Sequence, residues 1–140
     1  MDYKLIDFKT VSHPEPRFGC LTFAEKDSDI PFEINRIFWI YDTDKGISRG
    51  AHAHKKTWQL LVCPFGSIRI NLDDGENKES VVLDDPSKGL VLPPHIWHDM
   101  LWIIKGSLLC VAASDKYDPD DYLRDYDSFL EYYKDRIEEI

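Results

Sequence analysis

Short apolar runs alternate with clusters of Gly, Pro and Asp along residues 4–113. Strands repeated at intervals of about 8–12 residues are typical of all-β sandwiches and barrels. The pattern therefore predicts an all-β barrel or jelly roll that covers about residues 4–114. The runs expected to form strands are Leu5–Phe8, Gly19–Ala24, Ile34–Tyr41, Thr57–Cys63, Ser67–Leu72, Ser80–Leu83, Gly89–Leu92, Met100–Ile104 and Ser107–Ala113.

Two glycine-containing turns are candidates for hairpins. Asp74-Gly75 and Lys105-Gly106 each stand between two apolar runs. Glycine accepts the positive φ that tight hairpin turns require. We therefore expect each turn to connect two paired strands.

The pattern changes after residue 117. Asp118 and Pro119 are typical of a helix start, and apolar residues then recur at spacings of three and four. This indicates a C-terminal helix over about residues 118–138, packed on the barrel or on a partner subunit. We expect residues 1–140 to form a single domain. The apolar stripe of the helix consists of Tyr122, Tyr126, Phe129, Tyr133 and Ile137.

Composition excludes several classes of protein. Seventeen Lys and Arg against 26 Asp and Glu give a net charge of −9, the opposite of what non-specific nucleic-acid binding needs. No apolar run approaches the roughly 20 residues of a membrane helix, and no secretory signal precedes the first strand. Three cysteines without a CxxC pair indicate reduced thiols. We expect a cytoplasmic protein with no nucleic-acid or membrane partner.

The charge is unevenly distributed. The segment from Arg49 to Lys56 is locally basic and contains no acid, although the chain as a whole is acidic. An anionic small ligand is therefore compatible with this segment.

The same segment contains a pair of histidines, His52 and His54. Residues two apart on a strand point to the same face, so both imidazoles are expected to project into the barrel. Two buried imidazoles are costly unless they bind a metal, a ligand or hydrogen-bonding neighbours. The pair is therefore a candidate for chemistry.

The glycines around this pair complete a recognisable spacing. Gly46, His52, His54 and Gly66 resemble the first motif of the cupins, with Gln59 where that motif has glutamate. His98 stands where the second cupin motif supplies its last histidine. The resemblance implies a small cupin jelly roll.

Two kinds of site remain open for these residues. In one, His52, His54 and His98 bind a divalent metal, with Gln59 as a weak fourth ligand. In the other, one histidine is a general base and the rest orient a substrate. Gln59 removes the only anionic ligand, which modestly favours the metal-free site, although three histidines alone can hold a metal.

Beyond these motifs, the chain resembles the WxcM-like sugar 3,4-ketoisomerases, which act on dTDP-4-keto-6-deoxy-D-glucose. The resemblance implies an isomerase without a metal or other cofactor, active as a homodimer in deoxysugar synthesis for surface polysaccharides or glycosides. Such an enzyme moves the sugar ketone from C4 to C3 through an enediolate. The most specific matches are Arg49–Lys56, Trp97–Met100, Ala113–Asp118 and Asp121–Tyr126.

The resemblance also implies roles for single residues. His52 and His54 are the expected catalytic residues, since an imidazole of ordinary pKa serves as both acid and base. Arg49 is the leading candidate for the diphosphate because a guanidinium holds phosphate oxygens bidentately. Phe18 and His98 are expected to border the sugar and to affect which C4 epimer forms. Weaker substrate-binding candidates are Arg36, Arg69, Phe38 and Gln59.

Two alternatives stay open beside the ketoisomerase. One is a metal-dependent cupin enzyme that uses the three histidines. The other is a cupin that binds a sugar nucleotide without catalysis.

Overall fold

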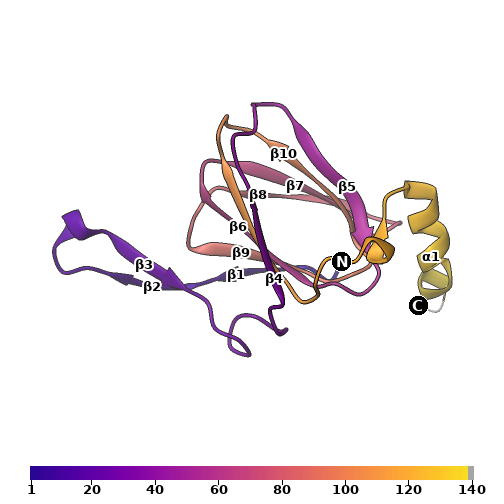
Figure 1. Ribbon diagram of the computed structural model, residues 1–140, viewed down its shortest axis with the longest axis horizontal. Helices are drawn as coiled ribbons and strands as arrows, with labels where there is room; N and C mark the ends of the chain where they lie inside the picture. The colour runs from indigo at the N-terminus through magenta and orange to yellow at the C-terminus, as the bar shows by residue number, and fades with distance from the viewer. Residues whose placement is uncertain (139–140) are drawn as a thin grey trace.

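Two five-stranded antiparallel sheets face each other and form the body of the molecule (Figure 1). The computed structural model describes residues 1–138, with side chains through residue 134. One sheet has the order β1 (Lys4–Asp7), β9 (Lys88–Leu92), β6 (Gln59–Phe65), β11 (Leu108–Ala113) and β4 (Arg36–Ile40). The other has the order β12 (Tyr122–Leu123), β5 (Ser48–His54), β10 (Trp97–Trp102), β7 (Ile68–Asp73) and β8 (Lys78–Leu83). The all-β jelly roll of cupin type expected from the sequence is confirmed.

The hydrophobic core lies between the two sheets. On β7, Ile68, Ile70 and Leu72 alternate with polar residues and point inward, where they are almost fully buried. Trp102 is also fully buried. Its Nε1–H donates a hydrogen bond to the Ser107 carbonyl over 2.8 Å, so this polar group is paired within the core. The packed core fixes the inward and outward faces of the strands that form the site.

One of the two predicted hairpins is present. Asp74-Gly75 connects β7 to its neighbour β8, with Gly75 at φ 97°. Lys105-Gly106 also turns the chain, but it leads from β10 in one sheet to β11 in the other. The hairpin prediction at Lys105-Gly106 was wrong, because a turn signal does not tell which strands pair across it.

The C-terminal helix is shorter than expected. α1 spans Tyr126–Glu138 and begins eight residues later than the sequence indicated. Asp118 instead caps the short 3-10 helix η2 (Pro119–Asp121), and Tyr122–Leu123 pairs with β5 as β12. Phe129 and Tyr133 are buried against the sheet, as predicted for the apolar stripe, whereas the side chain of Ile137 lies outside the described residues. Within residues 1–138, no helix is long and apolar enough to cross a membrane.

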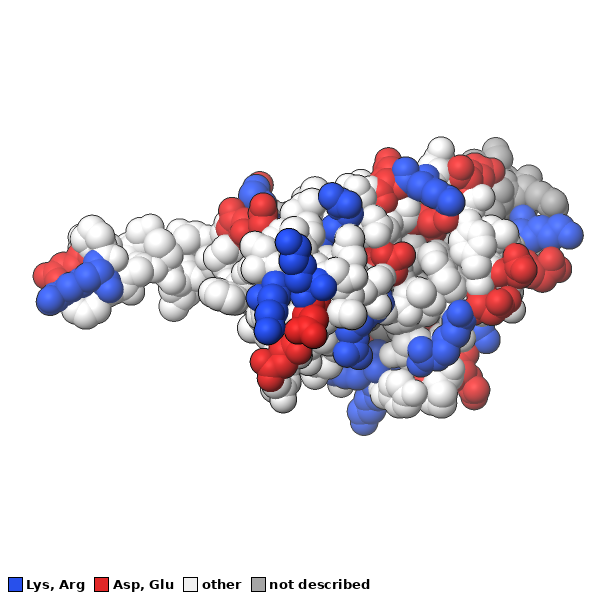
Figure 2. All heavy atoms as spheres, turned by 90° about the horizontal axis from the view of Figure 1, so that it is seen from above, with Lys and Arg blue, Asp and Glu red and all other residues white. Residues whose placement is uncertain are grey.

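An arm projects from the body of the molecule (Figure 1). It consists of β2 (Lys9–Ser12), the 3-10 helix η1 (Pro16–Phe18) and β3 (Cys20–Phe23), and its two strands pair only with each other. Val11, Phe18 and Leu21 are 59%, 61% and 61% exposed. Figure 2 shows that uncharged residues cover most of the arm between its charged tip and the barrel. These apolar side chains lie far from the core of their own chain.

Candidate active site

A cavity of about 380 Å³ opens between the two sheets and is lined by His52 and His98. Strands of both sheets line it, so its shape depends on the whole barrel. Its walls are formed by Phe38, Ile40, Arg49, Gly50, His52, Gln59, Leu61, His98, Met100, Val111, Tyr122 and Arg124.

A larger hollow of about 570 Å³ lies on the outer side of the sheet, against the start of α1. The polar side chains at its centre already form hydrogen bonds with each other. Tyr126 donates to Asp73 over 2.8 Å, and Asn71 donates to Asp99 over 2.7 Å. The cavity between the sheets, which contains unpaired imidazole nitrogens, is the better candidate for chemistry.

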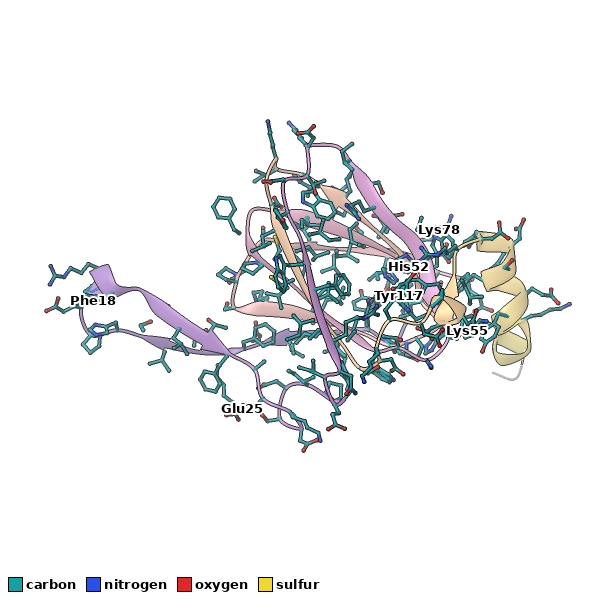
Figure 3. All side chains as sticks on the ribbon, in the orientation of Figure 1. Phe18, Glu25, His52, Lys55, Lys78 and Tyr117 are labelled. Carbon is teal, nitrogen blue, oxygen red and sulfur yellow. The ribbon has the colours of Figure 1, made fainter. Side chains whose placement is uncertain are left out.

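Three imidazoles meet at the inner cavity, and Figure 3 labels one of them, His52. His52 and His54 come from β5, and their ring centroids are 5.1 Å apart. His98 lies directly opposite His52 in the strand register, with the ring centroids 4.8 Å apart. His54 and His98 are both 2% exposed. The prediction that the His52–His54 pair faces the interior is confirmed.

A β-bulge brings Arg49 to the same face as these histidines. On β10, His98 pairs with His52 and Met100 pairs with Arg49, so one residue of β5 is extra between them. Ala51, at φ 58°, lies within this irregular stretch. Side chains directly opposite across two strands share a face, and those of His98 and Met100 point inward. Arg49 therefore lines the cavity, although it lies three positions before His52 in the sequence.

Gly50 permits the close approach of the two strands at this bulge. Its φ is 92°, and an added Cβ would lie 3.0 Å from Met100 Sδ and 3.3 Å from the His98 carbonyl oxygen. A side chain here is therefore both strained and crowded.

Asp121 holds His54 in place. His54 Nδ1 lies 2.9 Å from Asp121 Oδ2, and both side chains are 2% exposed. The Lys56 backbone N–H and the Thr57 hydroxyl donate to the same carboxylate over 2.7 and 2.5 Å. A carboxylate only accepts hydrogen bonds, so His54 carries its hydrogen on Nδ1 and leaves a lone pair on Nε2.

Burial keeps the imidazoles neutral. Desolvation, aided by the nearby His54, lowers the pKa of His52 from 6.5 to about 4, although the Gly50 backbone partly offsets this shift. Burial also lowers the pKa of His54, and Asp121 opposes that shift. The pKa of His98 lies well below its ordinary value because the ring is fully buried beside His52. All three rings are therefore available as proton acceptors at neutral pH.

Two ring nitrogens in this cluster have no hydrogen-bond partner among the described residues. His52 Nδ1 and His54 Nε2 are buried, and neither has a hydrogen-bond partner at bonding distance among the described residues. Leaving such groups unpaired is costly, so the cavity is suited to a polar ligand that satisfies them.

Arginines surround the histidines on the side of β4 and β12. The Arg36 guanidinium lies over the Phe38 ring at 5.5 Å, and its Nη1 donates to the Tyr122 hydroxyl over 3.4 Å. The Arg124 guanidinium lies 4.3 Å from the centre of the Tyr122 ring. Both positive charges lower the pKa of His54. An anionic ligand would relieve this concentration of positive charge.

The family model described as "FdtA: WxcM-like, C-terminal" matches residues 1–134. The chain belongs to this family. A curated relative, the TDP-4-oxo-6-deoxy-alpha-D-glucose-3,4-oxoisomerase of Aneurinibacillus thermoaerophilus, is 42% identical over 132 residues, which cover 94% of this chain and 93% of the relative. The resemblance stated from the sequence is confirmed.

Solved structures of FdtA-like relatives share the fold closely. The crystal structure of a 3,4-ketoisomerase from Helicobacter canadensis is similar with a TM-score of 0.90 and 42% identity, over 96% of this chain and 98% of that chain. A variant of the 3,4-ketoisomerase QdtA from Thermoanaerobacterium thermosaccharolyticum, in complex with TDP-4-keto-6-deoxyglucose, matches with a TM-score of 0.89 and 40% identity, over 96% of this chain and 95% of that chain.

Most of the residues expected from the sequence meet in the cavity of this FdtA-like chain. Arg36 lies beside the cavity, and its guanidinium contacts Phe38 and Tyr122. Those that line or contact it directly are His52, His54, His98, Arg49, Gln59 and Phe38.

Two expected substrate-binding residues lie elsewhere. Arg69 is exposed on β7 between the inward-pointing Ile68 and Ile70, so the alternation of the strand turns it to the outer face. Phe18 lies at the tip of the arm, at the opposite end of the molecule from His52 (Figure 3). Neither reaches the cavity within one chain, so the assignment of Arg69 requires correction. The role of Phe18 beside the sugar stays a prediction, because a single chain does not test it.

Sequence reasoning missed Asp121, Tyr122 and Arg124 as site residues. It placed them on a helix, where a carboxylate and two neighbouring side chains would point in different directions. The Asp121–Tyr126 stretch nevertheless counts among the specific matches to the family. If this matching stretch had been interpreted as a loop and a short strand, these three residues would have been candidates for the site.

The three histidines also fit a metal ion in the type of their donor atoms. One ring nitrogen from each of His52, His54 and His98 lies within 4.8 Å of the other two. Neutral imidazole nitrogens suit Zn²⁺, Cu²⁺, Ni²⁺ and iron. Gln59, buried beside them, adds no negative charge.

Proposed function

We propose that this chain is a sugar-nucleotide 3,4-ketoisomerase, which moves the ketone of dTDP-4-keto-6-deoxy-D-glucose from C4 to C3. Its relatives at about 40% identity are TDP-sugar 3,4-ketoisomerases. The observation that carries the proposal is a cluster of three buried imidazoles, two of them with a ring nitrogen that has no hydrogen-bond partner, at a cavity bordered by arginines. We propose that the enzyme acts in the synthesis of deoxysugars for surface polysaccharides or glycosides.

The arginines provide the expected contact with the diphosphate. Arg49 and Arg124 line the cavity, and Arg36 lies against its wall. A guanidinium pairs with phosphate oxygens in a fixed, bidentate geometry, so these side chains fix the direction in which the sugar enters. The sugar ring then faces His52 and His98, where Phe38 and Tyr122 offer apolar and aromatic surface.

The chemistry requires proton transfer at two carbons and two oxygens. His52 lines the cavity, so we assign it the hydrogen on C3, which is acidic because C3 adjoins the C4 ketone. Its removal breaks the C3–H bond and gives an enediolate between C3 and C4. Return of the proton to C4, together with transfer of one proton from the C3 oxygen to the C4 oxygen, leaves the ketone at C3.

His54 is the proposed carrier between the two oxygens. Its Nδ1–H is fixed on Asp121, and its buried Nε2 has a free lone pair. The carboxylate stabilises the imidazolium that forms while His54 holds the proton. His54 then returns the proton to the neighbouring oxygen and recovers its starting state.

The low pKa of His52 is useful in the second half of this cycle. An imidazolium with a pKa of about 4 is a strong acid for a histidine, and it returns its proton readily to C4. The anionic diphosphate and the enediolate offset the nearby arginine charges and raise this pKa in the complex, which makes His52 a better base when substrate is bound.

The proposal is tested with the sugar in D₂O. We expect the enzyme to exchange hydrogen at C3, and NMR to identify a 3-keto product, including its C4 configuration. His52→Asn should abolish exchange at C3, and His54→Asn should abolish formation of the 3-keto product, while dTDP binding persists in both. His95→Asn is the control, because His95 lies outside the cluster and Asn tolerates its positive φ of 71°. Exchange at the parental rate in His52→Asn, or product formation at the parental rate in His54→Asn, would show that the catalytic assignment is wrong.

We also propose a homodimer in which the arm of one copy covers the other. The apolar side chains of the arm are exposed in the single chain, and Phe18 lies far from its own cavity although the resemblance implies that it borders the sugar. A second copy that receives the arm accounts for both observations.

We propose a cytoplasmic location as well, in keeping with the three free cysteines Cys20, Cys63 and Cys110.

A further inference from the structure

We propose that His52, His54 and His98 also bind one divalent transition-metal ion, and that this ion switches the enzyme off. The inhibition rests on the proposed function, whereas the binding of the ion does not. The ion would occupy the ring nitrogens that otherwise carry the proton. The site is thus an inhibitory one for Zn²⁺ or a similar ion, inside the substrate cavity.

The three donor atoms are close enough for one ion. One ring nitrogen of each histidine lies within 4.8 Å of the others. A tetrahedral ion with bonds of about 2.0–2.1 Å holds its ligands about 3.4 Å apart. The three rings therefore close around the ion through small side-chain rotations. His98 already pairs with His52 in the strand register, and its ring centroid lies 6.1 Å from that of His54.

The surroundings of two of the rings are those of metal-binding histidines. His54 Nδ1 is held by Asp121 over 2.9 Å, and His98 Nδ1 lies 3.1 Å from the Ile96 carbonyl oxygen. Since a carbonyl accepts a hydrogen bond, His98 carries its hydrogen on Nδ1, as His54 does. In both rings the lone pair is on Nε2. A histidine ligand ordinarily uses its second nitrogen in this way, to a carboxylate or a backbone carbonyl.

Charge and donor type determine which ions bind. Imidazole donors favour Zn²⁺, Co²⁺, Ni²⁺ and Cu²⁺, and disfavour Mg²⁺ and Ca²⁺, which prefer oxygen ligands. Gln59 provides no negative charge, and Arg36 and Arg124 act on His54 with positive charge. Affinity is therefore lower than in a site with three histidines and a glutamate.

Metal binding and isomerisation exclude each other for a chemical reason. A lone pair on Nε2 that coordinates a metal no longer accepts a proton from a sugar hydroxyl. An ion held by all three rings also occupies the space that the substrate needs beside His52. Each ligand therefore weakens binding of the other by the same factor.

The binding experiment uses Co²⁺ with chelator-treated protein and follows the visible absorption of four-coordinate Co²⁺. We expect saturable binding of one ion per chain. His98→Gln and His52→Asn should abolish it, Asp121→Asn should weaken it by about 10–100-fold, and Gln59→Glu should strengthen it. His95→Asn is the matched control, and its binding should equal that of the parent.

The inhibition experiment titrates Zn²⁺ into the isomerase reaction. We expect activity to fall with Zn²⁺, to return with EDTA, and the sugar nucleotide to weaken Co²⁺ binding. Absence of Co²⁺ binding, or binding that survives His98→Gln and His52→Asn, would overturn the metal site. Binding without inhibition would overturn only the exclusion. If the chain does not isomerise the sugar, the proposed function fails while the Co²⁺ titration still decides the site.

Discussion

The histidine cavity and the β2–β3 arm differ in the side chains that they expose to water. The cavity region buries polar side chains, and one of them, Asp121, accepts three hydrogen bonds. The arm exposes apolar side chains and has no core of its own. Burying a Val or Leu side chain contributes about 1.5–3 kcal/mol, so the exposed arm forgoes a substantial stabilisation.

This difference indicates where the site is complete in one chain and where it is not. The three histidines, Asp121 and the arginines of the candidate site all come from a single chain. The proposed sugar side of the cavity receives no cover from the arm of the same chain, and the arm exposes apolar surface. The predictions below change one region while a matched variant leaves the other intact.

The largest effect is expected from the arm. The double variant Val11→Asp, Leu21→Asp places charge on its apolar surface, so a dimer held by the arm should dissociate and lose nearly all activity. Val82→Asp, on β8, is the control because Val82 is also an exposed apolar residue (44%) outside the arm. Light scattering coupled to size exclusion measures the mass. A parent that is monomeric, or a double variant that stays dimeric, would refute the role of the arm.

A smaller loss is expected from Asp121→Asn. The amide supports His54 less well than the carboxylate, so kcat should fall about a hundredfold, at the lower end of what a positioned proton carrier contributes. Asp121 raises the pKa of His54, so the variant should move the acid limb of the pH–rate profile to lower pH. Asp118→Asn, in the cap of the same short helix, should retain activity. A purely structural role would leave the pH profile unmoved.

The buried histidines should also make stability depend on pH. The folded-state pKa of His52 is lowered from 6.5 to about 4, so the unfolded chain binds more protons between these values. The free energy of unfolding therefore falls as pH drops from 6.5 toward 4, by on the order of 3 kcal/mol for this residue. Urea titrations at fixed protein concentration measure it. His52→Asn should flatten the dependence, and an unchanged slope would contradict the shift.

The smallest effect is expected at the bulge. Gly50→Ala should lower the free energy of unfolding by about 1–3 kcal/mol, since its φ is strained for alanine and the new Cβ meets Met100. Gly46→Ala separates the two causes, because Gly46 has a similar φ of 84° but nothing within 4 Å of the added atom. Only Gly50→Ala should also raise KM, through displacement of Arg49. Equal KM values in both variants would exclude that coupling.

Some of this site follows from local pattern and some does not. The period of two along a strand is a short-range property, and it correctly placed His52 and His54 on one face. The inward position of Arg49 depends on a one-residue irregularity opposite β10, which no alternation rule contains. Asp121 was placed on a helix because Pro119 and the following spacing favour one locally, whereas pairing of Tyr122 with His54 decides the conformation.

The error at Arg69 has the same physical origin. Arg69 was judged by its charge, but the packing of Ile68 and Ile70 turns it outward. The role of Phe18 was judged by resemblance and stays a prediction, because a single chain does not bring it to the cavity. Both positions depend on contacts between distant parts of the sequence, or between two chains, which local patterns do not encode.

The extra residue in β5 has a consequence for how this enzyme can change. Arg49 and His52 are three positions apart, so regular alternation would turn them to opposite faces, and the bulge brings them to the same face. Removing Ala51 would leave them two positions apart, and they would still point the same way in a regular strand. A residue added to β10 opposite the bulge would instead let β5 pair regularly with Ala51 in place and turn the Arg49 guanidinium to the outer face. The direction of Arg49 therefore depends on the relative lengths of the two strands, so an insertion can change it without any substitution.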